Sequence, residues 1–526
     1  MGLNIKILDC TLRDGGYYTN WDFDKALVEQ YVSSINQLPI EYLEVGYRSI
    51  PKKGYLGKYF YCPIYELEYI RELSEKKLVL ILNEKDTKLE YLNNLLLPVK
   101  GLVHMIRMAI DPQNIAHALL LAARIKEMGF EVGFNVMYMS KWKEYVGFFD
   151  ELQKLDGIVD YFYMVDSYGG VYPSDVIETI SLIKQNSKCK IGFHGHNNLE
   201  LALINSITAI EHGADIVDST VLGMGRGAGN LKTELLLSVL NSKYELRVDF
   251  NAVGNAVNAF QGLLAKHQWG TNLPYMISGS NSLPQKDVME WVTARFYSFN
   301  SIIRALQNQK DKLIDNEQLP KFKPSKSFTK VAIIGGGKNA VDHAKAVRQY
   351  IEADKNICII HASSKNASFY SGINVDQYFC LVGNEGHRLE RVFKDLGDFV
   401  GKCILPPFPR KMGTYIPPNV YERSFELDKV DFTNKLTDSH TVLALQAAID
   451  LKAEEIFFVG YDGYQEVPVT QLERMLANEN EVLFTCFKEY FGKDLVSLTP
   501  TQYQGLTVNS IYSLLYEREG SVFSSH

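Results

Sequence analysis

The chain has 526 residues, so we expect two to four domains. Its composition, 46% hydrophobic and 22% charged, is that of a globular protein and excludes a disordered or fibrous chain. The formal net charge of -7, from 62 acidic and 55 basic residues, provides no broad basic field, which argues against a nucleic acid or an anionic membrane as partner.

No signal-peptide pattern follows the first residues, and no apolar run approaches the ~18 residues that cross a bilayer. We therefore expect a cytoplasmic protein that acts on a small molecule. The seven cysteines form no CxxC pair and are expected to be reduced thiols.

The first half of the chain alternates short β-branched runs with longer amphipathic stretches, which predicts parallel βα units. Eight such runs occur, at residues 5–10, 42–47, 78–83, 102–109, 131–138, 161–167, 190–196 and 215–223. Eight strands predict a (β/α)8 TIM barrel of ~250 residues, with its active site at the carboxyl ends of the strands.

The second half has a different organisation. Residues 250–315 are predicted to be a helical extension, which gives a barrel domain of residues 1–315. Residues 316–329 lose periodicity and gain Pro, Lys and Ser, as a linker does. Apolar runs within residues 330–526 predict a smaller Rossmann-like open α/β domain.

Three ligand-type side chains stand at predicted strand ends of the barrel. Asp14 follows the first strand, and His194 and His196 end the seventh. Residues two apart in a strand point the same way, so both imidazoles can face the barrel axis. One carboxylate and two neutral imidazoles would leave positions open on a divalent ion, as a catalytic metal site requires.

Three ordered segments resemble the metal-dependent aldolase and Claisen-lyase superfamily, which includes 4-hydroxy-2-oxovalerate aldolase, hydroxymethylglutaryl-CoA lyase and isopropylmalate synthase. They are "DCTLRDG" (9–15), "VDSYGGVYP" (165–173) and "GFHGHNNLELALINSITAIEHGADIVDSTVLGMGRGAGNLKTE" (192–234). The resemblance runs over residues 4 to 300.

The resemblance implies a divalent metal, Mn2+ or Mg2+ with Zn2+ or Co2+ as alternatives, held by Asp14, His194 and His196. Asn230 matches an asparagine that ligates or supports the metal in some members. The implied activity is that of an aldolase that forms or cleaves a 4-hydroxy-2-oxo acid through a metal-bound pyruvate-type enolate. Its substrates would be a 2-oxo acid and an aldehyde, and a homo-oligomer is expected because barrels of this group commonly dimerise.

Catalytic roles follow for the residues after the first strand. Asp14 would hold the cation. Arg13 has a planar guanidinium with a fixed positive charge, which would stabilise the developing enolate oxygen. The alternative is that Arg13 only forms an ion pair with Asp14 or Glu44. Pyruvate-linked members usually carry a histidine just after "LRDG", where this chain has Tyr17 and Tyr18. Tyr17 is the predicted acid/base residue, and the two glycines before it are expected to give a loop room to turn.

Several residues at strand ends are further candidates. His104 or Tyr138 could move the proton in place of Tyr17. Candidates for binding the substrate are Glu44, Arg107, Asn135, Ser167 and Arg226. Each of them could instead have a structural role.

Two departures make the CoA-using branches a weaker match. Gly16 and Tyr17 stand where acetyl-CoA synthases carry an acid and a glutamine, and "GMGRGAGN" (223–230) lacks the cysteine of hydroxymethylglutaryl-CoA lyases. A Claisen-type acyl-CoA condensing enzyme remains an alternative. Another is a non-catalytic barrel whose chain carries nucleotide-binding or transferase activity in the second domain.

The second domain opens with "VAIIGGGKNA" (331–340), which satisfies G-x-G-x-x-A between a predicted strand and helix. Such glycines let a phosphate approach the helix N-terminus. The next strand ends at His361 and Ser363 rather than at a ribose-binding acid, which argues against NAD.

A partial resemblance links "DSHTVLALQAAIDLKAEEIFFVGYDGY" (438–464) to pterin pyrophosphokinase-like and sialyltransferase-like Rossmann families. It implies a nucleotide pocket lined by Gly335, Gly337, Asn339, Ser439, His440 and Asp462. A fusion of this kind is typical of biosynthesis, and a sugar or surface glycan is the expected context.

Overall fold

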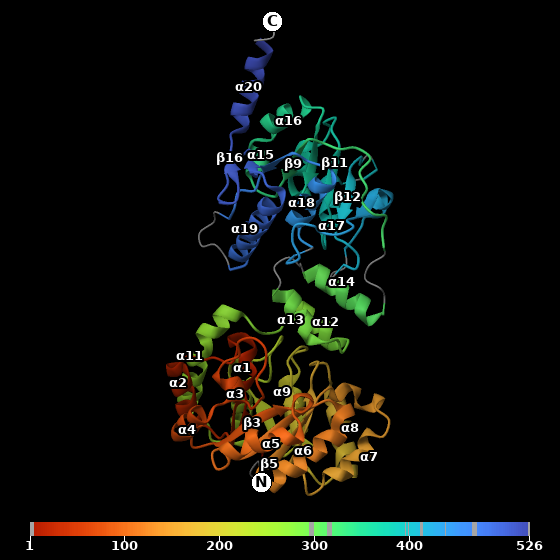
Figure 1. The fold of residues 1–526 in the computed structure, drawn as a ribbon. Helices are drawn as coiled ribbons and strands as arrows, with labels where there is room; N and C mark the ends of the chain where they lie inside the picture. Colours follow the sequence, from red (N-terminus) through yellow and green to blue (C-terminus); the bar gives the residue numbers. More distant parts are fainter. Residues whose placement is uncertain are drawn as a thin grey trace. The chain divides into compact units, whose positions relative to one another are not determined.

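The computed structural model describes residues 5–293, 299–312, 318–394, 396–397, 399–410, 414–436, 438–464 and 471–523. Contacts between residues divide the chain into two compact units, Met1–Glu290 and Trp291–His526 (Figure 1). No helix in the described ranges is both long and apolar enough to span a bilayer.

The first unit is a closed barrel of eight parallel strands that neighbour one another in chain order, as the sequence predicts. Pairing of the first strand with both the second and the eighth closes the ring. The strands are β1 (Lys6–Asp9), β2 (Tyr42–Tyr47), β3 (Lys77–Asn83), β4 (Met105–Ile110), β5 (Glu131–Val136), β6 (Tyr161–Asp166), β7 (Lys190–Gly195) and β8 (Ile216–Ser219).

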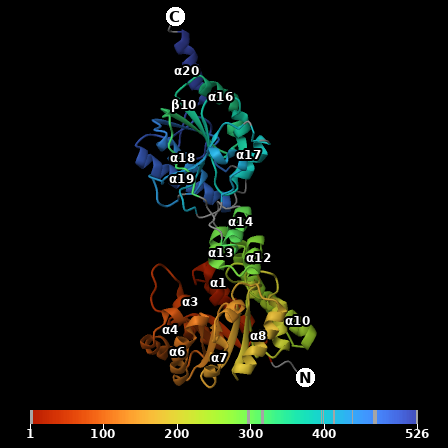
Figure 2. The same ribbon diagram turned by 90° about the vertical axis from the view of Figure 1, so that its right-hand side faces the viewer.

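Helices surround the strands and bury apolar faces against them (Figures 1 and 2). They are α1 (Thr11–Thr19), α2 (Lys25–Asn36), α3 (Lys58–Tyr61), α4 (Ile64–Leu73), α5 (Leu92–Leu96), α6 (Ile115–Glu127), α7 (Phe148–Glu151), α8 (Pro173–Asn186), α9 (Ala202–Glu211), α10 (Thr233–Tyr244) and α11 (Phe250–His267). Two further helices, α12 (Leu273–Ser280) and α13 (Gln285–Thr293), follow in the chain and contribute no residue to this core.

Large side chains fill the barrel at the amino ends of its strands. Tyr42, Tyr161 and Tyr163 are fully buried there. Lys6 Nζ donates to Tyr161 Oη at 2.8 Å, and Tyr42 Oη donates to Glu131 Oε2 at 2.8 Å, so the hydroxyls of Tyr161 and Tyr42 are paired. Because this end is packed, the opposite end is the one that can receive a substrate.

The segment after β1 differs from the expected loop, because it forms helix α1. Its glycines serve close packing rather than a turn. A Cβ on Gly16 would lie 2.1 Å from the Trp21 ring, and one on Gly15 would lie 2.6 Å from Met224 Sδ. Helix α1 can therefore lie directly against these side chains, which fixes the positions of the residues it carries.

The second unit contains an eight-stranded parallel sheet of order β13-β12-β11-β10-β9-β14-β15-β16. Its strands are β9 (Lys330–Ile334), β10 (Ile357–His361), β11 (Gln377–Cys380), β12 (Lys402–Leu405), β13 (Ser424–Glu426), β14 (Glu455–Val459), β15 (Val496–Ser497) and β16 (Thr507–Val508). The sequence predicted the cores of β9, β10, β11 and β14. It missed β12, which is as long as β11, and also β13, β15 and β16, which have only two or three residues each.

Helices cover both faces of this sheet, with α18 and α19 on one side and α17 on the other (Figure 2). The described helices here are α14 (Phe299–Lys310), α15 (Asn339–Asp342), α16 (Ala344–Glu352), α17 (Glu385–Phe393), α18 (His440–Asp450), α19 (Gln471–Phe491) and α20 (Ile511–Phe523). Strand order reverses between β9 and β14, which makes their carboxyl ends a topological switch point.

The division between the units lies earlier in the chain than the linker expected at residues 316–329. Helix α14 accounts for the difference. Its Arg304 pairs with His387 Nε2 at 2.9 Å and lies 5.1 Å from the centre of the Tyr415 ring. These contacts attach α14 to the second unit, although helical periodicity alone grouped it with the barrel.

Candidate active site

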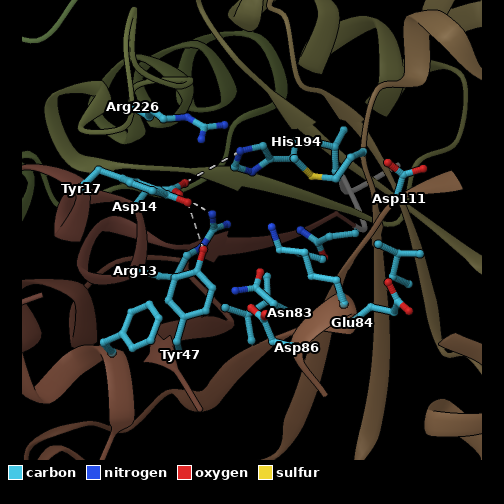
Figure 3. A pocket seen from close by; sticks show the side chains of 18 of the residues that line it. Arg13, Asp14, Tyr17, Tyr47, Asn83, Glu84, Asp86, Asp111, His194 and Arg226 are labelled. Atoms are coloured by element: carbon cyan, nitrogen blue, oxygen red, sulfur yellow. Dashed lines mark hydrogen bonds and ion pairs between the residues drawn. The ribbon is translucent and has the colours of Figure 1, made fainter. Parts of the chain in front are cut away.

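A cavity of about 590 Å³ opens at the carboxyl ends of the barrel strands (Figure 3). Arg13, Asp14, Tyr17 and Arg226 lie on one side of it, and Asn83, Glu84 and Asp111 lie on the opposite side. His194 and His196 also line it, so the structure brings together the residues expected to form a metal site.

Asp14 is 3% exposed and is surrounded by donors. Its Oδ2 accepts from Asn230 Nδ2 at 2.7 Å and lies 3.8 Å from His194 Nε2, while Oδ1 pairs with Arg13. Burial alone would raise the pKa of Asp14, but the charge of Arg13 and the hydrogen bond from Asn230 lower it below its usual value. The carboxylate is therefore ionised at neutral pH.

The two histidines are held in a fixed orientation by their Nδ1 atoms. His194 Nδ1 donates to Asp218 Oδ2 at 2.9 Å, and His196 Nδ1 donates to the backbone oxygen of Asp166 at 2.7 Å. Burial lowers the pKa of His196 to about 3, so this imidazole is neutral. A neutral imidazole anchored through Nδ1 presents Nε2 as a free lone pair, which is what a metal ligand needs.

Asn230 completes this group. Its backbone bridges that of His196, and its side-chain Oδ1 is buried without a hydrogen-bond partner among the described residues. A carbonyl oxygen of this kind, next to a carboxylate and two imidazoles, suits a divalent cation. The residues of this site therefore fit a bound metal.

A second set of potential ligand atoms lies on the other side of His194. Cys10, His194 and Asp218 have ligand atoms within 4.8 Å of one another. Asp218 Oδ2, however, already accepts from Arg107 and His194, and burial raises the pKa of the Cys10 thiol. These groups fit the role of support for His194 better than that of an open site.

Arg13 lines the cavity, and one of its buried donors has no partner among the described residues. Its Nε donates to Glu44 Oε2 at 2.7 Å and its Nη1 to Asp14, whereas Nη2 has no partner in the part of the chain that the structure describes. Burial would lower the pKa of this guanidinium, but the two carboxylates raise it. A fixed, charged donor is thus available next to the candidate metal ligands.

Beneath the cavity, Arg107 links three polar residues. It is fully buried and donates to Asn135 Oδ1 at 2.7 Å, to Glu44 Oε1 at 3.3 Å and to Asp218. Burial would raise the pKa of Asp218, but the charge of Arg107 and the bond from His194 lower it. Neither Arg107 nor Glu44 lines the cavity, so the structure places these two predicted substrate-binding residues one layer below it.

The other predicted substrate-binding residues occupy different positions. Asn135 and Arg226 line the cavity, and the Arg226 guanidinium lies 5.2 Å from the centre of the Tyr17 ring. Ser167 does not line it, and its Oγ accepts from the backbone nitrogen of Tyr138 at 2.8 Å.

Tyr17 lies on the cavity wall with its hydroxyl 3.3 Å from that of Tyr47. Of the alternatives for proton transfer, Tyr138 also lines the cavity. His104 directly precedes β4 and therefore lies at the amino end of the barrel, away from the site. Tyr18 donates to the backbone oxygen of Gly227.

Asp218, Cys10 and Tyr47 were not among the residues predicted from the sequence. A signal existed for Asp218, since an acid at the end of the eighth strand must lie at the same mouth as His194. Tyr47 ends the second strand and could have been found in the same way. Cys10 carries no sequence signal for its position under Asp14.

A second cavity, of about 710 Å³, lies within the second unit. Among the predicted nucleotide-binding residues, Gly335, Gly337, Ser439, His440 and Asp462 line it. Asn339 does not, and its backbone nitrogen donates to Asp462 Oδ2 at 2.9 Å.

Comparisons with known proteins support an aldolase family for the barrel. Residues 105–258 match the HMGL-like family model. A 4-hydroxy-2-oxovalerate aldolase from Pelotomaculum thermopropionicum is 30% identical over 277 residues, which cover 50% of this chain and 78% of the relative. Another, from Bacillus cereus, is 31% identical over 258 residues, which cover 47% and 72%.

A solved structure is also similar. The crystal structure of the N-terminal domain of a putative aldolase from Bacteroides vulgatus has 60% sequence identity and a TM-score of 0.55. The match covers 57% of this chain and 100% of that domain.

Proposed function

Because the chain belongs to the HMGL-like family of aldolases and is a carbon–carbon lyase, we propose that its barrel forms or cleaves a 4-hydroxy-2-oxo acid through a pyruvate-type enolate. The observation that carries this proposal is the position of Arg13. Arg13 lines the same cavity as Asp14, His194 and His196, and its buried Nη2 has no hydrogen-bond partner among the described residues.

Asp14, His194 and His196 would hold a divalent cation, with Asn230 beside them. When bound, the cation supplies Lewis acidity that makes the carbon next to the oxo group easier to deprotonate or to release. Asp218 and the backbone of Asp166 keep both imidazoles in the required tautomer.

Arg13 would donate through Nη2 to the oxo oxygen as that atom gains negative charge. Its other two nitrogens are held by Asp14 and Glu44, and Glu44 is in turn held by Arg107. The guanidinium therefore does not need to reorganise during the reaction, which is the condition under which an oriented donor accelerates catalysis most.

Tyr17 is the proposed acid/base group for the 4-hydroxyl. Its phenol faces the cavity, and Tyr47 Oη can hydrogen-bond it. In the cleavage direction its oxygen would take the hydroxyl proton as the carbon–carbon bond breaks while its own proton passes to a water molecule, and the reverse relay would return the proton in synthesis. Arg226 lies over the same ring and can attract the substrate carboxylate.

The wall opposite Arg13 favours a hydroxylated aldehyde over a purely aliphatic one. Asn83, Glu84, Asp86 and Asp111 line it, and Lys52 pairs with Asp86 Oδ1 at 2.7 Å (Figure 3). Amide and carboxylate groups at this end of the cavity can hydrogen-bond hydroxyls. This supports a role in the metabolism of a sugar.

Retro-aldol cleavage tests the proposal. Incubation of the protein with 4-hydroxy-2-oxovalerate, or with a sugar-derived 4-hydroxy-2-oxo acid, in the presence of Mn2+ or Mg2+ should release pyruvate. Chelation should stop the release. If neither substrate yields pyruvate under conditions in which calorimetry shows the metal to be bound, the proposed reaction is wrong.

The alternative of a Claisen-type condensation is tested in parallel. Acetyl-CoA supplied with a 2-oxo acid should release no free thiol if the aldolase assignment holds. The aldolase relatives do not support the other alternative, a non-catalytic barrel.

A further inference from the structure

The glycine motif of the second unit lies at an independent cavity that the barrel chemistry does not use. The 710 Å³ space is lined by residues that follow β9, β10, β11 and β14, and it therefore spans the switch point of the sheet. Crevices at the carboxyl ends of strands on either side of a switch point are where open α/β sheets bind ligands. Its volume is in the range of small-molecule sites.

Positively and negatively charged side chains line different parts of this cavity, because they follow different strands of the sheet. Lys338 follows β9, Lys365 follows β10 and Arg388 follows β11, so the cations come from one half of the sheet. Glu473 and Glu479 lie on α19, which follows β14 on the other half. The cavity is therefore cationic toward β11 and acidic toward β14.

The cationic half is held in place by a buried acid. Glu385 is 3% exposed and accepts from Arg388 at 2.9 Å, from His440 at 3.3 Å and from Ser364. Arg388 also donates to Ser363 Oγ at 3.2 Å. Because the Arg388 side chain keeps 42% of its surface exposed, its guanidinium can still meet an anion.

The acidic half is rich in hydrogen-bonding groups. Thr441 Oγ1 donates to Asn480 Oδ1 at 2.9 Å, and Asn480 Nδ2 donates to Tyr503 Oη at 2.9 Å. All three residues line the cavity beside Glu479. Carboxylates accept hydrogen bonds from vicinal hydroxyls, and Tyr503 and Tyr461, each 7% exposed, give this part of the cavity an aromatic lining.

The glycine turn itself is not arranged for a dinucleotide. Asp462 Oδ2 accepts from the backbone nitrogen of Asn339, so a carboxylate occupies the position where a pyrophosphate would approach the turn. A Cβ on Gly337 would lie 2.5 Å from the Asp462 carboxyl carbon, which shows that the glycine is required by this contact. His361, at the end of β10, is fully buried and stacks on Phe379 with 4.4 Å between ring centres, so it cannot contact a ribose.

From this arrangement we infer that the second unit binds a nucleoside phosphate, with the phosphate toward Lys365 and Arg388 and the nucleoside toward Glu479 and Tyr503. A sugar phosphate would share the cationic half but would leave the acidic, aromatic half unused. A dinucleotide would need the turn that Asp462 occupies.

Calorimetric titration of the full chain separates these ligands. The ligands are the common nucleoside mono- and diphosphates, ribose 5-phosphate, inorganic phosphate and NAD. At least one nucleoside phosphate should bind about tenfold or more tightly than ribose 5-phosphate and phosphate. The inference would be overturned if ribose 5-phosphate or NAD bound as tightly as the best nucleoside phosphate. It would also be overturned if no nucleoside phosphate bound.

Arg388→Ala should weaken nucleoside phosphate binding about tenfold or more, because a charged hydrogen bond is lost. Arg391→Ala is the matched control, since this arginine lies on the same helix but does not line the cavity. Lys365→Ala removes an exposed cation near the start of the 3-10 helix Ser364–Tyr370, and it tests the cationic half of the cavity if Arg388→Ala fails to fold. Binding that neither variant weakens would place the phosphate elsewhere and contradict the inference.

Discussion

The barrel and the second unit both gather polar side chains at the carboxyl ends of parallel strands, but they bury their charges to different degrees. In the barrel, the side chains of Arg13 and Arg107 are 9% and 0% exposed and share the buried carboxylate of Glu44. In the second unit, the side chains of Arg388 and His440 are 42% and 33% exposed and share one buried acid. Buried, interlocked charges suit a site that must stabilise a developing charge, whereas half-exposed cations suit a ligand that enters and leaves.

The largest effect is expected for Asp14→Asn. This change removes the only carboxylate of the proposed ligand set and leaves Arg13 without one of its two partners. Cleavage should fall by about 10³-fold or more, because the cation contributes several kcal/mol to the reaction. Steady-state kinetics and metal analysis of the purified variant would measure the loss. An active variant that retains its metal would contradict the ligand assignment.

Arg13→Ala should lower the rate of cleavage nearly as much as Asp14→Asn, but for a different reason. The loss of an oriented donor to the oxo oxygen predicts about 10²- to 10³-fold lower kcat. Metal affinity should remain, since Asp14, His194 and His196 are still present. Arg13→Lys should restore little activity, because a lysine cannot bond Glu44, Asp14 and substrate together. If Arg13→Ala loses the metal as well, the residue is a support of the metal site rather than an enolate donor.

Tyr17→Phe should lower cleavage by about 10²-fold while leaving enolate formation intact, because proton transfer to the hydroxyl contributes about this much. Tyr47→Phe is the control, since it removes only the neighbouring hydroxyl at 3.3 Å. Kinetics of cleavage and of pyruvate proton exchange, measured side by side, would separate the two steps. Equal loss in both assays would mean that Tyr17 only shapes the cavity.

The smallest expected effect is a change in how the stability of the second unit depends on pH. Burial would raise the pKa of Glu385, but His440, Arg388 and Ser364 lower it to about 2. A depressed carboxyl pKa stabilises the fold at pH values above that of the unfolded chain, and this contribution disappears as the pH falls toward 2. Compared with Glu385→Gln, the wild type should lose about 1 to 2 kcal/mol of stability between about pH 5.5 and about pH 3.5.

Urea unfolding of both proteins at each pH would measure this difference. Identical pH dependence in the two proteins would mean that Glu385 does not organise the cationic half of the cavity.

The sequence predicted most of the barrel because each strand is a compact apolar run followed by a polar end. The same rule placed Asp14, His194 and His196 at one mouth, and all three line the cavity. It could not separate residues on the cavity wall from those one layer below, which is why Glu44 and Arg107 were grouped with Asn135. That distinction depends on the packing of long side chains inside the barrel.

Local pattern was least informative where tertiary contacts decide the structure. "TLRDGGYYT" contains two glycines and was expected to be a loop, yet packing against Trp21 and Met224 holds it as helix α1. Strands β15 and β16 have two residues each, too few for a periodic signal. Helix α14 has a clear amphipathic pattern, but only its contacts show which unit it joins.

Exchange of the methyl protons of pyruvate in D2O, followed by NMR with and without Mg2+, reports directly whether the barrel forms the pyruvate enolate. We expect metal-dependent exchange without any aldehyde, abolished by Asp14→Asn and Arg13→Ala and largely retained by Tyr17→Phe. Absence of exchange in a protein that calorimetry shows to bind both Mg2+ and pyruvate would contradict this expectation.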